Sequence, residues 1–331
     1  MPSFRTGVVT GIRGERPGLQ RVEVDGEPAY VVTQLTGTVA VGDRVVMNTT
    51  AADLGLGTGG WHFVHWNLER GSWSEPGAGT VMKLRYTSLQ VDTGAAEEDE
   101  PGSLPRAVDL GRRPVVACTL HSQVAAVAVA FGRAAPGHRL VYVMTDSAAL
   151  PLVLSELVFE LRERGLLAAT VTCGQAFGGD YEAVSVPSAL QVAVARAGAD
   201  AVVVGPGPGV VGTDSGFGFG GVEVAWVVDV AAHLGARAVT AVRFSDADPR
   251  DRHRGVSHHT TTALALAGTR PLVAVPEGGS FEGLDVEGVE VEVPEDLDFG
   301  SATTMGRTPA QDPGFFRWAA AAGVLAAQLV R

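Results

Sequence analysis

Residues 238–264 read Ala-Val-Thr-Ala-Val-Arg-Phe-Ser-Asp-Ala-Asp-Pro-Arg-Asp-Arg-His-Arg-Gly-Val-Ser-His-His-Thr-Thr-Thr-Ala-Leu. The stretch begins with an apolar, β-branched run, Ala238–Val242, which predicts a buried strand. It leads into Ser257, a residue type that favours the N-cap of a helix, with His258 and His259 in the first helical turn. The stretch therefore predicts a strand, a polar loop and a helix in succession, which is the repeating unit of a parallel α/β sheet.

The same alternation recurs on both sides of this segment. Short runs rich in valine and alanine predict strands, and most of them are followed by a loop and a helical pattern. The predicted strands are 115–119, 140–144, 168–173, 201–204, 238–244 and 272–275, and the predicted helices are 124–131, 151–164, 188–197, 222–234 and 313–330. Continuous apolar strands that alternate with helices predict an α/β domain with a mostly parallel sheet and helices on both faces.

The N-terminal part of the chain follows an all-β pattern instead. The dipeptide Asp25–Gly26 lies between two β-branched runs and predicts a hairpin turn. The segment 41–47 repeats the succession of a turn and a strand, and residues 81–91 predict a further strand. Residues 1–91 therefore predict a small barrel or sandwich.

An acidic segment separates the two patterns. Residues 92–111 contain Glu97-Glu98-Asp99-Glu100 together with prolines and glycines, a composition that is poor in core residues. We expect this segment to be a linker and residues 112–331 to form the α/β domain.

The composition limits the partners that the protein can have. The net charge of −12 argues against nucleic acid and against an anionic membrane surface, because both favour a basic face. The two cysteines, Cys118 and Cys173, lie in apolar runs and form no disulfide framework, which favours the reducing cytoplasm. The most apolar tract, residues 319–330, is shorter than the roughly 20 residues of a membrane span. A cytoplasmic protein without a membrane partner is expected.

Polar residues gather in the loops that follow the predicted strands, whereas the turns that enter the strands contain fewer of them. In an open α/β sheet the carboxyl ends of parallel strands share one edge, and ligands bind there. Besides the loop within 238–264, the candidate ligand-binding residues at this edge are His121, Asp146, Cys173, Asp180 and Asp214. The sequence therefore predicts a ligand site at the carboxyl edge of the sheet.

The adjacent histidines His258 and His259 are the predicted general acid or base, since imidazole titrates near neutral pH. Asp146 or Asp251 would orient the reacting ring. With His253, the same two histidines could also bind a divalent metal. Neither Cys-x-x-Cys nor His-Glu-x-x-His occurs in the sequence, so the metal remains an open option.

Arg250, Arg252 and Arg254 alternate along the loop, a spacing that suits a bidentate grip on a phosphate or carboxylate. The backbone at the predicted helix start after Ser257 would add donors. A second interpretation stays open, in which the arginines pair with neighbouring aspartates and hold the loop. Those aspartates are Asp246, Asp248 and Asp251.

Residues 205–221 contain eight glycines, and Gly207, Gly209 and Gly212 match the dinucleotide-binding spacing. Prolines at 206 and 208 interrupt the match, and no helix starts directly after it. We therefore predict a flexible loop that closes over a ligand.

Several of these motifs occur together in one known family. They are Gly178-Gly-Asp-Tyr-Glu-Ala-Val184, Gly207-Pro-Gly-Val-Val-Gly-Thr213, Ala247–His259, Gly57-Thr-Gly-Gly-Trp-His-Phe-Val-His-Trp-Asn67 and Val81–Tyr86. In these motifs the chain resembles a bacterial family known as domain of unknown function 3866. The resemblance extends over nearly the whole chain and implies no activity or catalytic residue.

The sequence leaves three functional hypotheses. The first is a hydrolase or transferase that acts on a small anionic metabolite at the carboxyl edge of the sheet. The second is a sensor that binds such a metabolite without turnover, since no nucleophile and base stand out as a pair. The third is an assembly component that forms a homodimer through the apolar helix of residues 313–331.

Overall fold

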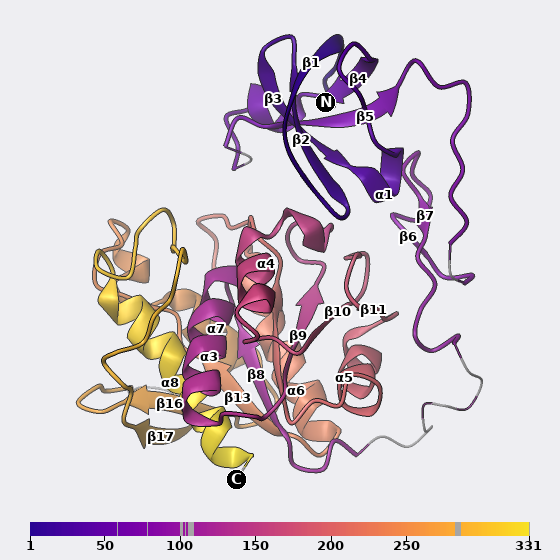
Figure 1. Ribbon diagram of the computed structural model, residues 1–331. Coiled ribbons are helices and arrows are strands. Elements are labelled where there is room, and N and C mark those ends of the chain that lie inside the picture. Colours follow the sequence, from indigo (N-terminus) through magenta and orange to yellow (C-terminus); the bar gives the residue numbers. More distant parts are fainter. Residues whose placement is uncertain are drawn as a thin grey trace. The chain divides into compact units, whose positions relative to one another are not determined.

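The chain folds into two compact units, Met1–Thr93 and Gly94–Arg331 (Figure 1). The computed structural model describes residues 1–57, 59–77, 79–99, 102, 104, 109–281 and 286–330. Thr58, Arg331 and the linker residues 100, 101, 103 and 105–108 lie outside the described residues.

The first unit is a closed five-stranded barrel in the order β1-β2-β3-β5-β4. Its strands are β1 (Phe4–Arg16), β2 (Leu19–Val24), β3 (Glu27–Val32), β4 (Arg44–Asn48) and β5 (His62–Asn67). Asp25 and Gly26 both have positive φ, 51° and 83°, as a two-residue hairpin turn between β2 and β3 requires. Inward valines such as Val22 and Val45 fill the barrel, so the prediction of a small N-terminal β structure is confirmed.

Short elements accompany the barrel. They are α1 (Thr33–Thr36), α2 (Thr50–Asp53), and the two-stranded ribbon of β6 (Met82–Lys83) and β7 (Val91–Asp92). The single strand predicted over 81–91 is wrong, because Leu84 and Tyr86 have positive φ and turn the chain between β6 and β7.

The second unit contains an eight-stranded sheet in the order β11-β10-β9-β12-β8-β13-β16-β17, and all its neighbouring strands are parallel. The strands are β8 (Pro114–Cys118), β9 (Leu140–Thr145), β10 (Ala169–Thr172), β11 (Tyr181–Glu182), β12 (Ala201–Pro206), β13 (Arg237–Ala241), β16 (Leu272–Pro276) and β17 (Glu287–Val291). The central strands are buried on both faces, which explains their unbroken apolar sequences. The predicted α/β fold with a parallel sheet is confirmed.

Helices cover both faces of this sheet. They are α3 (His121–Ala134), α4 (Glu156–Glu163), α5 (Val186–Ala195), α6 (Val224–His233), α7 (His258–Leu266) and α8 (Pro313–Leu329), with the 3-10 turns η1 (Leu152–Leu154), η2 (Gly220–Glu223) and η3 (Asp251–His253). One core cluster joins α3, α4 and α8 to the sheet, and another joins α5 and α6 to it. The strand order switches at β8, with β12, β9, β10 and β11 on one side of it and β13, β16 and β17 on the other. Because these strands are parallel, the carboxyl ends of β8, β9, β12 and β13 share one edge.

The predicted strand 238–244 is wrong at its end. The strand β13 stops at Ala241, and Phe244 pairs with Val256 in the separate ribbon of β14 (Phe244–Ser245) and β15 (Gly255–Val256). The backbone of Arg243 has left the sheet: its N–H donates to Thr260 Oγ1 at 2.9 Å, and its carbonyl accepts from the Ser257 N–H at 2.8 Å. Hydrogen bonds to the start of α7 thus replace the sheet ladder.

The structure also bears on two further expectations, the linker and the homodimer. Part of the predicted linker packs in the core of the second unit, where Ala96 and Leu110 are buried because their small or apolar side chains cover the sheet. The helix α8 lies against α3 and the sheet, with Ala319–Ala322 fully buried, so its apolar face is covered within the chain. A homodimer through this helix stays a prediction, because the described residues of α8 leave little apolar surface exposed for a second copy of the chain. Among the described residues, no helix combines the length and the apolar character of a membrane span.

Candidate functional site

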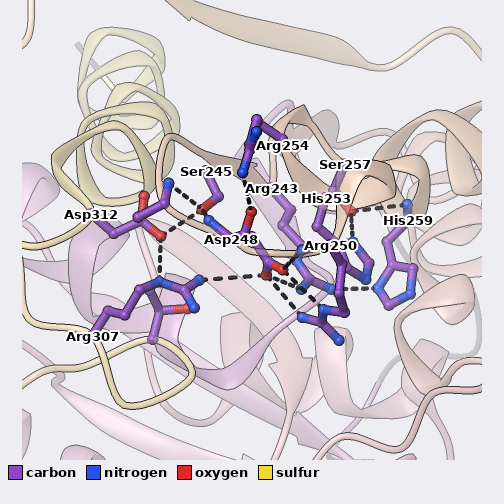
Figure 2. Close-up of polar contacts among 12 residues, drawn as sticks. Arg243, Ser245, Asp248, Arg250, His253, Arg254, Ser257, His259, Arg307 and Asp312 are labelled. Carbon is purple, nitrogen blue, oxygen red and sulfur yellow. Dashed lines mark hydrogen bonds and ion pairs between the residues drawn. The ribbon is translucent and has the colours of Figure 1, made fainter.

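The loop after β13 and the start of α7 form a polar centre at the carboxyl edge of the sheet (Figure 2). Ser257 is the N-cap of α7, and its hydroxyl accepts a hydrogen bond from the His259 N–H at 3.2 Å. The predicted cap is therefore present, and it places His258 and His259 in the first turn.

One half of this centre is a network of ion pairs around the fully buried Asp248, both of whose carboxylate oxygens bind an arginine. Arg250 forms a bidentate pair with the Asp248 carboxylate, at 2.9 Å to Oδ1 and 2.8 Å to Oδ2. Arg307 and Arg243 approach Oδ2 at 3.5 and 3.8 Å. Burial alone would raise the pKa of the Asp248 carboxyl, but the hydrogen bonds from Arg250 outweigh it and hold the pKa well below its usual range.

The network continues to Asp312, the buried residue that precedes α8. Its Oδ2 accepts from the Ser245 hydroxyl at 2.6 Å and from Arg307 Nε at 2.9 Å. Ser245 in turn accepts from the Asp248 N–H at 2.9 Å. Two aspartates and the arginines around them therefore hold the loop in place. For Arg250 this favours the second interpretation of the sequence, in which the arginines pair with neighbouring aspartates.

The other half of the centre is a cluster of three histidines. The ring centroids of His253, His258 and His259 lie 4.5 to 5.0 Å from one another. His253 Nδ1 is 2.7 Å from the Ser257 hydroxyl. Arg243 Nη1 lies 2.7 Å from His259 Nδ1 and donates to it, since a guanidinium has no acceptor. Neutral His259 must therefore carry its proton on Nε2.

All three rings are neutral at physiological pH. Burial is the largest cause and the charge of Arg243 the next, and together they lower the pKa of His253 to about 3 and that of His259 to about 2. Burial and the charge of Arg252 also lower the pKa of His258. His258 Nε2 is buried and has no hydrogen-bond partner among the residues that the structure describes. The cluster thus lies in a positive local field and presents an unused polar atom, two properties that suit an anionic ligand.

The donor set fits a metal ion less well. One ring nitrogen from each histidine lies within 4.8 Å of the others, a spacing that could contract around a cation. However, the hydrogen bond from Arg243 leaves His259 Nε2 protonated, and a metal ligand must be a lone pair. Metal-bound histidines normally donate to an acceptor, whereas here the second partner is a cation. The arrangement favours an anion over a divalent metal.

The glycine-rich loop after β12 covers this cluster. A bridge between Gly212 and Phe219 folds the loop into a hairpin, and the Phe219 ring stacks on His259 at 3.8 Å with an interplanar angle of 2°. Asp214 forms an ion pair with Arg252, which ties the loop to the arginine segment. The loop therefore lies beside the histidines, whereas its closing over a ligand stays a prediction.

The remaining loop glycines serve close packing or a turn. A Cβ atom at Gly207 would lie 2.6 Å from the Ala149 carbonyl oxygen, and one at Gly221 would lie 2.6 Å from that of Thr119. Gly209 is exposed with φ of 80°, a conformation that L side chains rarely adopt. Of the three glycines with the dinucleotide-like spacing, Gly207 is therefore required by close packing and Gly209 by its backbone conformation.

His121 lies elsewhere on the same edge, at the start of α3. Its Nδ1 is 2.9 Å from the Pro206 carbonyl, and its Nε2 is 2.7 Å from the Ser155 hydroxyl. Burial lowers the pKa of His121 to about 4, although the bond to Pro206 acts in the other direction. Both ring nitrogens are occupied, so this histidine joins β12 to the N-cap of α4.

The other predicted residues are held by β9 and β10 or are exposed on the loop. Asp146 accepts from the Gln175 N–H at 2.8 Å, and Asp180 accepts from the Thr170 N–H at 2.8 Å and pairs with Arg162 at 3.2 Å. The buried Cys173 Sγ lies 3.6 Å from the Met144 carbonyl oxygen. These contacts do not join the histidine cluster.

Asp251 is exposed on η3, and exposed Arg254 reaches the Asp248 carbonyl oxygen at 3.5 Å.

Sequence reasoning missed most of the residues that organise the centre. It named Asp248 as a partner of the loop arginines but gave no role to Arg243, whose position beside a strand end could have suggested one. Arg307 and Asp312 lie more than fifty positions downstream, and no local signal connects them to the loop. Phe219 was a detectable signal, as an aromatic residue at the end of a glycine-rich segment.

Comparison with known proteins identifies the family. The sequence profile of a family described as "Protein of unknown function (DUF3866)" matches residues 28–294, from β3 to just beyond β17. The chain belongs to this family, and the resemblance seen in its motifs is confirmed. No curated protein and no solved structure matches the chain significantly.

Proposed function

We propose that the α/β unit is an enzyme, a hydrolase or transferase, that binds a small anionic metabolite at the histidine cluster under the glycine-rich loop. The single observation that supports this most is the hydrogen bond from Arg243 to His259 Nδ1. It fixes a neutral imidazole with an N–H donor on Nε2 and places a positive charge directly behind the ring. A neutral donor in a positive field binds anions and repels cations.

In this proposal the Nε2–H of His259 and the guanidinium of Arg252 donate to the anionic group of the metabolite. The unpartnered His258 Nε2 is the general base or acid. The charge of an anion bound between His259 and Arg252 raises the pKa of His258, because a nearby opposite charge stabilises the imidazolium. Binding of the substrate would thus bring this histidine toward the pKa range in which proton transfer is efficient.

The proposal includes a movement of the loop. Phe219 covers His259, and Asp214 occupies Arg252 with its own carboxylate. An anionic metabolite competes with Asp214 for the same guanidinium, so its arrival releases the loop at that point. The exposed segment 211–218 can then close again over the bound ligand.

Calorimetric titration with inorganic phosphate and with malonate tests the binding site. We expect binding to wild-type protein at pH 7 and at least tenfold weaker binding to Arg252→Gln and His258→Ala. Arg133→Gln is the matched control, because this exposed arginine on α3 pairs with Asp296 and has no part in the proposed site. Equal binding by all four proteins contradicts the site. Binding that never leads to turnover of any tested ester or phosphoester would leave the sensor hypothesis in place of the enzyme.

A further inference from the structure

A second polar group at the same sheet edge is built around Glu223, the last residue of η2. Its Oε1 accepts hydrogen bonds from the Ser147 hydroxyl at 2.8 Å and from the Thr145 hydroxyl at 2.5 Å. Thr145 ends β9 and is buried, whereas Ser147 lies in the following loop and is partly exposed. A serine that solvent can reach is therefore hydrogen-bonded directly to a carboxylate.

Two glycines make this approach possible. A Cβ atom at Gly220 would lie 2.8 Å from the Ser147 carbonyl oxygen, and one at Gly221 would lie 2.6 Å from the Thr119 carbonyl oxygen. Backbone oxygens cannot move aside as flexible side chains do, so only glycine permits η2 to lie this close to the ends of β8 and β9. The glycine-rich segment thus ends by placing the Glu223 carboxylate against Ser147.

The Glu223 carboxylate has the properties of a base. Its hydrogen bonds, in the part of the chain that the structure describes, come from hydroxyls and not from a cation. Burial raises the pKa of Glu223, the two hydroxyls partly offset that effect, and the charge of Asp146 adds to it. A carboxylate with a raised pKa accepts a proton more readily near neutral pH.

Comparison with Ser155 shows what distinguishes Ser147. Ser155 is also hydrogen-bonded to a base, His121, but only 3 % of it is exposed and its Oγ accepts from the Val158 N–H as the N-cap of α4. Ser147 caps neither of the next two helical elements that the structure describes, since η1 begins after Pro151 and α4 after Ser155. Its hydroxyl donates to Glu223, and its partial exposure permits contact with a substrate.

We propose that Ser147 is a nucleophile, that Glu223 is its general base, and that Thr145 positions the carboxylate. The substrate class is a carboxylic ester of a small anionic metabolite, so this inference rests on the proposed function and supplies its nucleophile. Covalent catalysis of this kind needs a nucleophile and a base within hydrogen-bond reach, about 2.6–3.2 Å apart.

The reaction needs no reactant besides the ester and either water or an acceptor alcohol. Ser147 Oγ bonds to the carbonyl carbon while its proton passes to Glu223. The bond from that carbon to the alcohol oxygen then breaks, and the alcohol leaves with the proton from Glu223. Water or the acceptor alcohol attacks the acyl-serine, Glu223 takes its proton, and the proton returns to Ser147 Oγ as the acyl bond breaks.

The test is labelling of the full chain with an alkyl fluorophosphonate, followed by intact mass and peptide mapping. We expect one adduct, at Ser147, that is absent from Ser147→Ala. In Glu223→Gln the labelling rate should fall on the order of 100-fold or more, the usual contribution of a general base. Ser122→Ala is the matched control, since this half-buried serine follows β8 and donates to Thr304 instead. A folded wild-type protein that takes no label, or a label that persists in Ser147→Ala, overturns the proposal.

The role of Thr145 has a separate readout. Thr145→Val removes a hydrogen bond that lowers the pKa of Glu223, so the midpoint of the pH profile of labelling should move upward, and Thr145→Ser should restore it. An unchanged midpoint contradicts the positioning role.

Phosphate titration of the same samples separates the two proposals. If Ser147 is labelled but phosphate does not bind, the proposed histidine site is contradicted and the proposed nucleophile stands. If phosphate binds but Ser147 is not labelled, the proposed nucleophile is contradicted and the histidine site stands.

Discussion

The Asp248 network and the histidine cluster lie side by side (Figure 2), yet they differ in how completely their polar atoms are paired. Both Asp248 oxygens bind Arg250, and Arg307 extends the network to Asp312. In the cluster, His258 Nε2 is buried, and no described residue is its hydrogen-bond partner. Arg243 joins the two halves through Asp248 and His259.

This difference separates stability from function. A buried charge with all its hydrogen bonds satisfied fixes the loop in one conformation, and removal of one member is costly. A buried polar atom without a partner costs stability and is retained where a ligand supplies the missing bond. We therefore expect substitutions in the network to unfold the protein and substitutions in the cluster to change binding.

The largest effect is expected from Asp248→Asn. The substitution leaves Arg243 and Arg307 without their shared carboxylate, and loss of one member of a buried ionic network costs about 3–5 kcal/mol. Urea denaturation measures the change. Asp251→Asn, on the exposed side of the same loop, is the control and should change stability by less than about 0.5 kcal/mol. A loss below about 1 kcal/mol for Asp248→Asn would remove the distinction between the two regions.

The next effect is acid sensitivity. The pKa of His253 falls in the folded state from 6.5 to about 3, and that of His259 from 6.5 to about 2. Below pH 6.5 the unfolded chain binds protons that the folded chain rejects, so stability is full above pH 6.5 and declines as pH falls toward 3. Denaturation midpoints between pH 8 and pH 4 measure this slope. The decline of stability with falling pH should be shallower in His253→Gln than in the wild-type protein. An equal decline in the two proteins contradicts a neutral His253 ring in the folded state.

A moderate effect is expected from His258→Leu, and it should appear in binding. The substitution removes the unpartnered Nε2, so stability should change by less than about 1 kcal/mol or increase. Phosphate affinity should fall at least tenfold. Calorimetry and urea denaturation on the same sample measure both quantities. A large loss of stability with unchanged affinity would place this histidine in the structural half.

The smallest effect is expected from Asp214→Asn. The ion pair with Arg252 is exposed on the aspartate side, so its loss should cost at most about 1 kcal/mol. Because Asp214 no longer competes for Arg252, phosphate should bind about twofold to fivefold more tightly, within the range of one exposed ion pair. Faster limited proteolysis within residues 211–218 would report a freer loop. Weaker phosphate binding contradicts the competition.

Local patterns predicted the architecture because the relevant forces are local. The alternation of valine-rich strands with helices, the Asp25–Gly26 turn and the Ser257 cap each depend on neighbouring residues, and the structure agrees with them. The predicted end of β13 was wrong because hydrogen bonds to α7 compete with those of the sheet at Arg243. That competition depends on tertiary contacts, which a local pattern does not contain.

The site was predictable only in part. The loop histidines and the glycine-rich loop lie together, as a shared sheet edge implies. The roles of the arginines depend on Arg307 and Asp312, which approach only in the folded chain. Glu223 was missed for the same reason, since its hydroxyl partners come from a strand end more than seventy positions earlier.

Nitrogen NMR of the histidine rings tests the central claim most directly. Spectra of ¹⁵N-histidine protein at pH 7, assigned with His253→Gln, His258→Gln and His259→Gln, would be recorded alone, with inorganic phosphate and with zinc. We predict three neutral rings in the free protein, with the proton of His259 on Nε2. Phosphate should shift the signals of His258 and His259, and zinc should not bind stoichiometrically. Tight zinc binding through these nitrogens, without a response to phosphate, would contradict an anion site.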